Sequence, residues 1–264
     1  VSKREDDMIT STSNQQIKNL SALINKSKER KKQKCFVVEG TKMCLEAPKE
    51  LLAATYVSES FAAGNEALNE LDGEYEIIAD NVFKAISDTQ TPQGIMSIVK
   101  MPEYSLEDVL DGDRTHLLIL ESIQDPGNLG TMIRTGEGAG ITGVIMNKTT
   151  VDIFNPKTVR STMGSLYRVP FVIVDDLKAT LAELKNSGIN LYAAHLKGKG
   201  LYDESDYTKA SGFLIGNEGN GLSDEIAECA NTYIKIPMEG QVESLNAAIS
   251  ATLLMYECNR QRRN

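Results

Sequence analysis

Short apolar runs rich in β-branched residues recur along the C-terminal part of this chain, and helical segments separate most of them. The runs are HLLILESI, TGVIM, YRVPFVIV, INLYAAHL, SGFLIGN and TYIKIPM. The helical segments are 128–139, 155–165, 176–187, 220–229 and 244–260. Such runs suit buried parallel strands, and their alternation with helices favours a sheet covered on both faces. The pattern predicts an α/β parallel-sheet domain over residues 115–264.

Residues 1–102 indicate a second, smaller α/β domain. An amphipathic helix is predicted over 14–33, with Ile17, Leu20, Leu23 and Ile24 on its apolar face. The run CFVVEG, a helical stretch ending near Leu52, and the strands ATYVSES, EYEIIADN and GIMSIVKM follow. The acidic stretch EYSLEDVLDGDR predicts a linker over 103–114. A chain of 264 residues is long enough for two such domains.

Charge is unevenly distributed along the chain. The net charge of −9 taken alone argues against nucleic acid, because phosphate binding requires clustered Lys and Arg. Residues 18–34 nevertheless hold seven basic side chains against the single acidic Glu29. A solvated helix face is the alternative reading of such a run. The candidate RNA-binding residues are Lys28, Arg30, Lys31, Lys32 and Lys34.

Several classes of protein do not fit this sequence. No apolar run approaches the roughly 18–20 residues of a membrane span, and the N-terminal VSKREDD lacks the apolar core of a signal peptide. The four cysteines form no C-x-x-C pair, and the two histidines are far apart, so no metal site is expected. We expect a cytoplasmic protein without membrane or metal partners.

The first chemistry-bearing loop is ESIQDPGNLGTMIRTGEGAG, residues 121–140. A strand ends, the Asp-Pro-Gly sequence makes a turn, and a helix starts near Asn128. Gly130 and Arg134 are four residues apart and share a helix face. A surface charge is the alternative for Arg134, but α/β sites usually form at such strand ends. The glycines at 138, 140 and 143 spell G-x-G-x-x-G, yet they close a helix, so helix termination explains them better than nucleotide binding.

Two further loops follow later strands. In FLIGNEGNGLSDE, three glycines surround Glu218 at a strand end, where a ligand can approach the backbone closely. In IKIPMEGQVESLNAAISATLLMYE, a loop leads into a long helix that begins at Ser244, which suits an N-cap. Asn246, in the first turn, is less well explained by capping. An apolar stripe on this helix is expected to pack in a core or a dimer.

These three loops, in this order and spacing, resemble the three motifs of the SpoU/TrmH branch of SPOUT RNA methyltransferases. The segment VRSTMGSLYRVPF resembles the connecting segment of the family. SNQQIKNLSALINKSKERKKQKCFVVEG and QTPQGIMSIV resemble the substrate-binding domain often fused to it, which is similar to certain RNA-binding ribosomal proteins. The resemblance covers nearly the whole chain.

The resemblance implies a trefoil knot, a homodimer with the active site near the subunit interface, S-adenosylmethionine as cofactor and RNA as partner. Carried over by motif, the polar catalytic site is Asn128, Arg134, Glu218, Ser244 and Asn246. The cofactor-binding residues are Leu196, Gly216, Ile236, Met238 and Leu245.

The implied reaction moves a methyl group from a sulfonium to a ribose 2′-hydroxyl. Arginine stays protonated at neutral pH, so we expect Arg134 to stabilise charge developing on the oxygen while a phosphate or water takes the proton. Asn128 would orient Arg134 or the ribose, while Ser244 and Asn246 would position the target nucleotide. Glu218 would hold Asn128 or Arg134, or offset the sulfonium charge.

Three alternatives stay open. Ribosomal RNA of the large subunit is preferred as substrate, because the fused N-terminal domain is commoner among such relatives, and transfer RNA is the alternative. A non-catalytic RNA-binding or ribosome-assembly factor would retain the fold but is expected to lose its site residues, and none is lost here. A nicotinamide dehydrogenase rests only on the misplaced glycine pattern.

Overall fold

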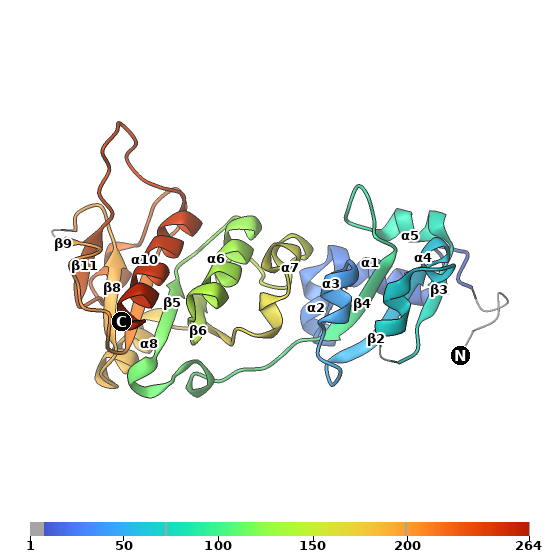
Figure 1. Cartoon of the computed structure of the whole chain (residues 1–264), viewed down its shortest axis with the longest axis horizontal. Helices are drawn as coiled ribbons and strands as arrows, with labels where there is room; N and C mark the ends of the chain where they lie inside the picture. Colours follow the sequence, from blue (N-terminus) through green and yellow to red (C-terminus); the bar gives the residue numbers. More distant parts are fainter. Residues whose placement is uncertain (1–7, 72, 199, 264) are drawn as a thin grey trace. The chain divides into compact units, whose positions relative to one another are not determined.

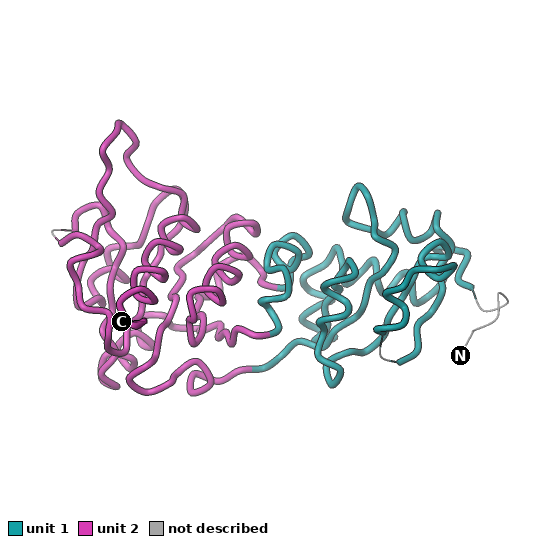
Figure 2. The backbone as a smooth tube through the Cα atoms, in the orientation of Figure 1, with its two compact units in different colours: residues 1–103, 154–167 teal, residues 104–153, 168–264 magenta. Residues whose placement is uncertain are grey.

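The computed structural model describes residues 8–71, 73–198 and 200–263 and divides into two units. Unit 1 comprises residues 1–103 together with 154–167, and unit 2 comprises 104–153 together with 168–264 (Figure 2). Both units combine helices with a sheet (Figure 1), as the sequence predicts. None of the described helices is long and apolar enough to cross a bilayer.

Unit 1 is built on a four-stranded mixed sheet in the order β1-β4-β2-β3. Its strands are β1 (Cys35–Glu39), β2 (Leu52–Ser58), β3 (Glu76–Ile78) and β4 (Ile95–Lys100). Its helices are α1 (Gln15–Asn25), α2 (Ser27–Gln33), α3 (Thr41–Leu45), α4 (Glu59–Ala62), α5 (Asp80–Ile86) and α7 (Pro156–Thr162), with 3-10 turns η2 (Glu66–Glu70) and η5 (Ser165–Tyr167). Strand β4 pairs antiparallel with both β1 and β2, while β3 pairs parallel with β2.

The predicted helix over 14–33 is divided into two helices, because the backbone of Lys26 adopts an extended conformation. Its apolar face is confirmed, since the four predicted residues are buried in the core of unit 1. Arg30 requires a correction. Its side chain is only 3% exposed, and its guanidinium donates to the carbonyls of Leu23 and Ile24, which end α1. Arg30 therefore satisfies the last carbonyls of α1 rather than facing solvent.

Unit 2 contains a seven-stranded sheet in the order β7-β6-β5-β10-β8-β11-β9, and its neighbouring strands pair parallel. The strands are β5 (His116–Leu120), β6 (Gly143–Asn147), β7 (Phe171–Val174), β8 (Asn190–Ala194), β9 (Gly200–Leu201), β10 (Ser211–Ile215) and β11 (Thr232–Lys235). The helices are α6 (Pro126–Ala139), α8 (Leu177–Asn186), α9 (Asp224–Ala227) and α10 (Ala247–Arg262), with 3-10 turns η3 (Glu107–Val109) and η4 (Gly112–Arg114). The predicted parallel sheet is confirmed, whereas the knot stays a prediction.

In this sheet β6 and β7 lie on one side of β5, whereas β10 and β8 lie on its other side. In an open parallel sheet, ligands bind at the carboxyl ends of the strands where the strand order reverses. The carboxyl ends of β5, β10, β8 and β11 are therefore where the architecture favours a site. The G-x-G-x-x-G pattern is explained by helix termination, as predicted, because Gly140 ends α6 in a left-handed conformation (φ 74°) and Gly143 starts β6.

The boundaries of the units differ from the sequence expectation in two respects. Residues 104–114, expected to be a linker, belong to unit 2, and Val109 is fully buried in its core. Residues 154–167, expected in the catalytic domain, belong to unit 1. There the Phe154 ring packs at a tilt against Phe36 with ring centroids 4.8 Å apart, and the Tyr167 hydroxyl donates to the carbonyl of Met43 at 2.8 Å.

A buried histidine at the start of β5 predicts acid sensitivity. His116 is 1% exposed, and its Nε2 has no hydrogen-bond partner among the described residues. Burial, with a smaller contribution from Arg262, lowers the pKa of His116 to about 4. The unfolded chain binds this proton near its ordinary pKa of 6.5, so the free energy of unfolding falls between about pH 6.5 and 4.

We expect His116→Leu to remove that part of the pH dependence, which amounts to about 3 kcal/mol at most. Urea unfolding of both proteins at intervals from pH 7.5 to 4 measures it. The free energy of unfolding of the unaltered protein should fall relative to that of the variant as the pH falls through this window. Parallel curves would contradict the assignment.

Candidate active site

The candidate site begins where β5 ends and α6 starts. Asp125 is the N-cap of α6, its side chain accepting from the Asn128 N–H at 2.8 Å, and Pro126 occupies the first turn. This is the favoured arrangement, because proline has no N–H to leave unsatisfied there. The helix therefore starts two residues earlier than the sequence predicts, and Asn128 lies in its first turn.

Glu218 fastens this loop to the loop that follows β10. Its carboxylate accepts hydrogen bonds of 3.0 Å from the backbone N–H groups of Gln124 and Asp125 and from the Asn128 side-chain amide. Partial burial acts to raise the pKa of Glu218. The hydrogen bonds from Asn128, Asp125 and Gln124 outweigh it and hold the pKa below its ordinary value. Of the roles expected for Glu218, the geometry supports holding Asn128.

Asn246 extends this connection to α10. Its Nδ2 donates to Asn128 Oδ1 at 3.0 Å, while its Oδ1 accepts from the N–H groups of Ala248 and Ile249. Asn246, not Ser244, is therefore the N-cap of α10, which begins three residues later than predicted. The Asn128 amide donates to a carboxylate and accepts from an amide, so both of its polar atoms are fixed. Glu218, Asn128 and Asn246 form one hydrogen-bonded chain.

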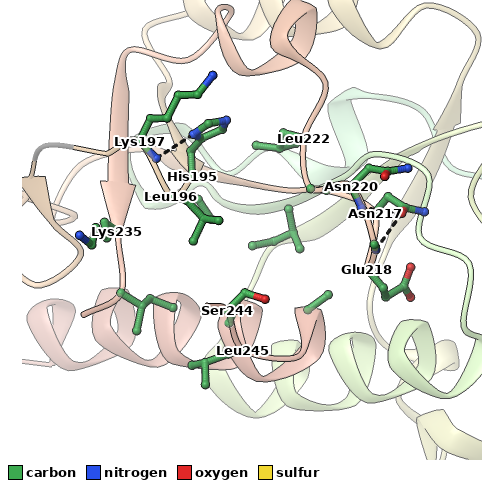
Figure 3. A pocket seen from close by; sticks show the side chains of 18 of the residues that line it. His195, Leu196, Lys197, Asn217, Glu218, Asn220, Leu222, Lys235, Ser244 and Leu245 are labelled. Atoms are coloured by element: carbon green, nitrogen blue, oxygen red, sulfur yellow. Dashed lines mark hydrogen bonds between the residues drawn. The ribbon is translucent and has the colours of Figure 1, made fainter. Parts of the chain in front are cut away.

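A pocket of about 590 Å³ adjoins this chain at the carboxyl ends of β8, β10 and β11. Figure 3 shows Glu218 at one side of the pocket and Lys235 at the opposite side, with Leu196 and Ser244 between them. The volume lies within the range of roughly 300–1,000 Å³ found for small-molecule sites. All five predicted cofactor-binding residues line it: Leu196, Gly216, Ile236, Met238 and Leu245.

The loop after β10 forms the pocket wall with its backbone. Asn217 Oδ1 accepts from the N–H groups of Gly219 and Asn220, and the Gly221 N–H bonds the Asn217 carbonyl at 2.8 Å. A Cβ at Gly216 would lie 2.1 Å from the backbone of Gly221 and Leu222. The chain therefore requires glycine here because two backbone segments approach closely.

The pocket fits the parts of S-adenosylmethionine. Leu196 is 64% exposed, and Ile236, Met238 and Leu245 are partly exposed, so apolar surface is available to a flat purine ring. Gly216, Gly219 and Gly221 line the pocket, where a ligand could approach the backbone closely. Glu218, which also lines the pocket, would offer negative charge to the sulfonium of such a cofactor.

Two predicted residues are not part of the hydrogen-bonded chain. Ser244 is exposed and lines the pocket. Arg134 is exposed on α6, outside the set of residues that line the pocket, and no hydrogen bond of its side chain is found among the described residues. Gly138, one turn after Arg134, faces Tyr256 of α10, because a Cβ there would lie 2.8 Å from the tyrosine hydroxyl. Arg134 thus lies on the side of α6 that borders α10.

Comparison with known proteins identifies the family. Residues 115–256 match the SpoU rRNA Methylase family, and residues 14–97 match the MRM3-like substrate binding domain. The chain belongs to the SpoU rRNA methylase family. The motif resemblance is confirmed, including the substrate-binding domain in the N-terminal part.

Relatives and solved structures match over nearly the whole chain. The 23S rRNA (guanosine(2553)-2′-O)-methyltransferase RlmP of Bacillus subtilis (strain 168) is 34% identical over 250 residues, covering 94% of this chain and 97% of that protein. The SpoU methyltransferase AviRb from Streptomyces viridochromogenes, in complex with AdoMet, is 26% identical, with a TM-score of 0.86 and coverage of 95% and 99%. An AdoMet-bound rRNA methyltransferase from Sinorhizobium meliloti is 28% identical, with a TM-score of 0.83 and coverage of 96% and 97%.

This SpoU family member is an RNA 2′-O-methyltransferase, and its cofactor is S-adenosylmethionine. Sequence reasoning missed several residues that shape its site. Asp125 was assigned to a turn, although an Asp before a proline is a recognisable N-cap signal. Asn217 and Asn147, which organise the loops, follow or end strands and carry no pattern that distinguishes them.

Proposed function

We propose that this enzyme methylates a ribose 2′-hydroxyl in folded large-subunit ribosomal RNA. The observation that carries the proposal is the hydrogen-bonded chain of Glu218, Asn128 and Asn246 beside a pocket lined by all five expected cofactor residues. The similarity to a 23S rRNA enzyme extends through both units, which favours rRNA over tRNA. A cytoplasmic location stays a prediction.

Leu196, Gly216, Ile236, Met238 and Leu245 would hold the adenosine part of the cofactor. When bound, S-adenosylmethionine supplies an electrophilic methyl group. The 2′-hydroxyl would lose its proton to a phosphate oxygen or water as its oxygen accepts that methyl group. The guanidinium of Arg134 stabilises the charge on the 2′-oxygen. Asn128 and Asn246 orient the ribose beside it, and alignment accounts for much of the rate.

RNA phosphates would contact the exposed face of α2. Lys28, Lys31 and Lys32 are exposed there, whereas the buried Arg30 no longer belongs to this set. Lys34 ends α2 and pairs with Glu103, and both side chains are more than 70% exposed. Such an exposed pair contributes little in water, so a phosphate can compete for Lys34. Binding is expected to weaken with salt.

The test is methyl transfer from radiolabelled S-adenosylmethionine to RNA from cells that lack the enzyme. Label in a large rRNA at one alkali-resistant linkage supports the proposal. Label in tRNA alone would identify tRNA, and not rRNA, as the substrate. Absence of both methyl transfer and cofactor binding would favour a non-catalytic factor.

Arg134→Ala should lower the transfer rate about tenfold, since one charge-assisted hydrogen bond exposed to water is removed. Single-turnover transfer measures this effect. The exposed Arg263→Ala is the matched control and should keep the full rate. Equal rates for both variants would remove Arg134 from the mechanism.

The active form would be a homodimer that packs through α10. This helix buries one apolar face in unit 2, yet Ile249 and Tyr256, on its other side, are 50% and 43% exposed. A helix with apolar residues on both sides requires a second cover. Because Arg134 lies on the neighbouring side of α6, dimerisation would place it at the subunit interface.

Ile249→Glu should therefore yield monomers with reduced methyl transfer, because a buried unpaired carboxylate opposes association. Sedimentation equilibrium measures the mass. Ile173→Glu is the control, since Ile173 is 46% exposed on the edge strand β7. If the Ile249→Glu variant remains a dimer and the Ile173→Glu variant is a monomer, the interface is formed by β7 and not by α10.

A further inference from the structure

Ser122, two residues after the end of β5, has a backbone conformation that serine rarely adopts. Its φ is +57°, in the left-handed region, which a residue with a Cβ enters at a penalty of about tenfold or more in population. Such residues persist where surrounding groups hold them, and they concentrate at functional sites. Two residues further along the chain is Gln124, whose N–H binds Glu218.

The side chain of Asn147, at the end of β6, holds Ser122 on two sides. Asn147 Oδ1 accepts from the Ser122 N–H at 2.9 Å, and Asn147 Nδ2 donates to Ser122 Oγ at 3.2 Å. Asn147 is itself fixed, because the Thr150 hydroxyl donates to the same Oδ1 at 2.9 Å. Ser122 Oγ also bonds the Thr149 hydroxyl at 2.6 Å, so loss of the Asn147 amide removes the partner of the Ser122 N–H and one of the two partners of its hydroxyl.

The carbonyl of Ser122 joins the two loops of the active site. It accepts from Asn217 Nδ2 and from Gln124 Nε2, each at 2.9 Å. Asn217 shapes the pocket wall through Gly219 and Asn220, while Gln124 and the following Asp125 bind the Glu218 carboxylate. The direction of this one carbonyl therefore sets both the pocket wall and the loop that carries Asn128.

We propose that Asn147 is a positioning residue for methyl transfer. It holds Ser122 in the left-handed conformation and thereby fixes the cofactor-binding loop against the loop that leads into α6. It touches neither the pocket nor Asn128 directly in the contacts described and acts through the Ser122 backbone. This inference rests on the proposed function for its kinetic consequence, but its effect on cofactor affinity is independent of the RNA substrate.

The experiment compares Asn147→Ala with Asn147→Ala in a Ser122→Gly background. Without the tether, serine should return to ordinary conformations, so the cofactor dissociation constant should rise and the single-turnover rate should fall, each about tenfold. Glycine adopts positive φ without penalty, so the double variant should recover to within about threefold of the unaltered enzyme. A residue that only stabilises the fold would not be rescued in this way.

Asn231→Ala is the matched control. Asn231 Oδ1 also accepts a backbone N–H from the same sheet, that of Leu191 in β8, at 2.8 Å. Asn231 directly precedes β11 and is not among the residues that line the pocket. It should lose thermal stability without a change in cofactor affinity or rate. Equal affinities for Asn147→Ala and Asn231→Ala would overturn the proposal, as would a double variant no better than the single one.

Two further outcomes remain decisive. If Asn147→Ala does not fold but the double variant folds and binds cofactor, the tether is supported. If neither folds while Asn231→Ala does, Asn147 serves the fold alone and the proposal fails. Calorimetric titration of S-adenosylmethionine decides these points even if the unaltered protein methylates no RNA, a result that would overturn only the proposed function.

Discussion

Replacing Gly216 with alanine should weaken binding of S-adenosylmethionine by about a hundredfold. The new methyl group would lie 2.1 Å from the carbonyl carbon of Gly221 and from the Leu222 nitrogen. Both neighbours are backbone atoms, so no rotamer change can relieve the contact, and the far arm of the loop must move. That arm lines the pocket, so its displacement removes the surface the cofactor needs. Calorimetric titration measures the dissociation constant.

Gly219→Ala in the same loop is the control. A Cβ at Gly219 would meet only Asn217 Oδ1 at 3.5 Å, an ordinary van der Waals contact. This variant should bind the cofactor within about threefold of the unaltered enzyme. Similar losses for the two variants would mean that loop flexibility, rather than the close approach at Gly216, determines affinity.

Replacing Glu218 with glutamine should lower the rate of methyl transfer about thirtyfold. The carboxylate accepts from three N–H donors, whereas glutamine offers one oxygen and directs an NH₂ group at a donor. Charge-assisted bonds of this kind contribute about 2 kcal/mol where solvent competes, which corresponds to the stated factor. Single-turnover transfer measures the effect.

The same carboxylate predicts how the rate responds to pH. Because hydrogen bonds hold the pKa of Glu218 below its ordinary value, its contribution persists through neutral and mildly acidic pH. It is lost only as the pH falls through that lowered pKa. Glu239→Gln removes an exposed charge of the loop before α10 and should leave the rate unchanged. A rate loss shared by both variants would indicate general electrostatics instead of the three bonds.

Much of this architecture could be predicted from the order of apolar runs. Buried parallel strands leave continuous β-rich segments, and residues that directly follow such strands meet at one edge of the sheet. For that reason the five residues predicted to bind the cofactor, drawn from the ends of β8, β10 and β11 and from the loop before α10, line a single pocket. Glu218 was recognisable because a carboxylate between glycines has little use as a solubilising group.

Other features depend on contacts that no local pattern encodes. Ser244 and Asn246 are both good capping residues two positions apart, and only the path of the loop decides that Asn246 caps α10. Arg30 lies among lysines, yet the break between α1 and α2 at Lys26 lets its guanidinium turn back to the last carbonyls of α1, so it is buried. A left-handed serine cannot be inferred from sequence, because only glycine signals that conformation reliably.

The stripe on α10 shows a further limit. The stripe predicted from the sequence, for packing in a core or a dimer, consists of Leu245, Ala248, Ile249, Thr252, Leu253 and Tyr256. Of these only Ala248 belongs to the face buried within the chain, which Ala251, Leu254 and their neighbours complete. The spacing of apolar residues predicts that a helix has an apolar face. It does not show which face serves the core of one chain when both faces are apolar.

The split composition of unit 1 limits how this enzyme can be recombined with its relatives. The segment 154–167 lies between β6 and β7 in the sequence but belongs to unit 1, so no single crossover point exchanges that unit whole. A chimaera that imports a foreign 1–103 would face the resident Phe154 and Tyr167 with unfamiliar partners. An exchange of the N-terminal unit between two SpoU enzymes therefore requires that residues 1–103 and 154–167 are replaced together.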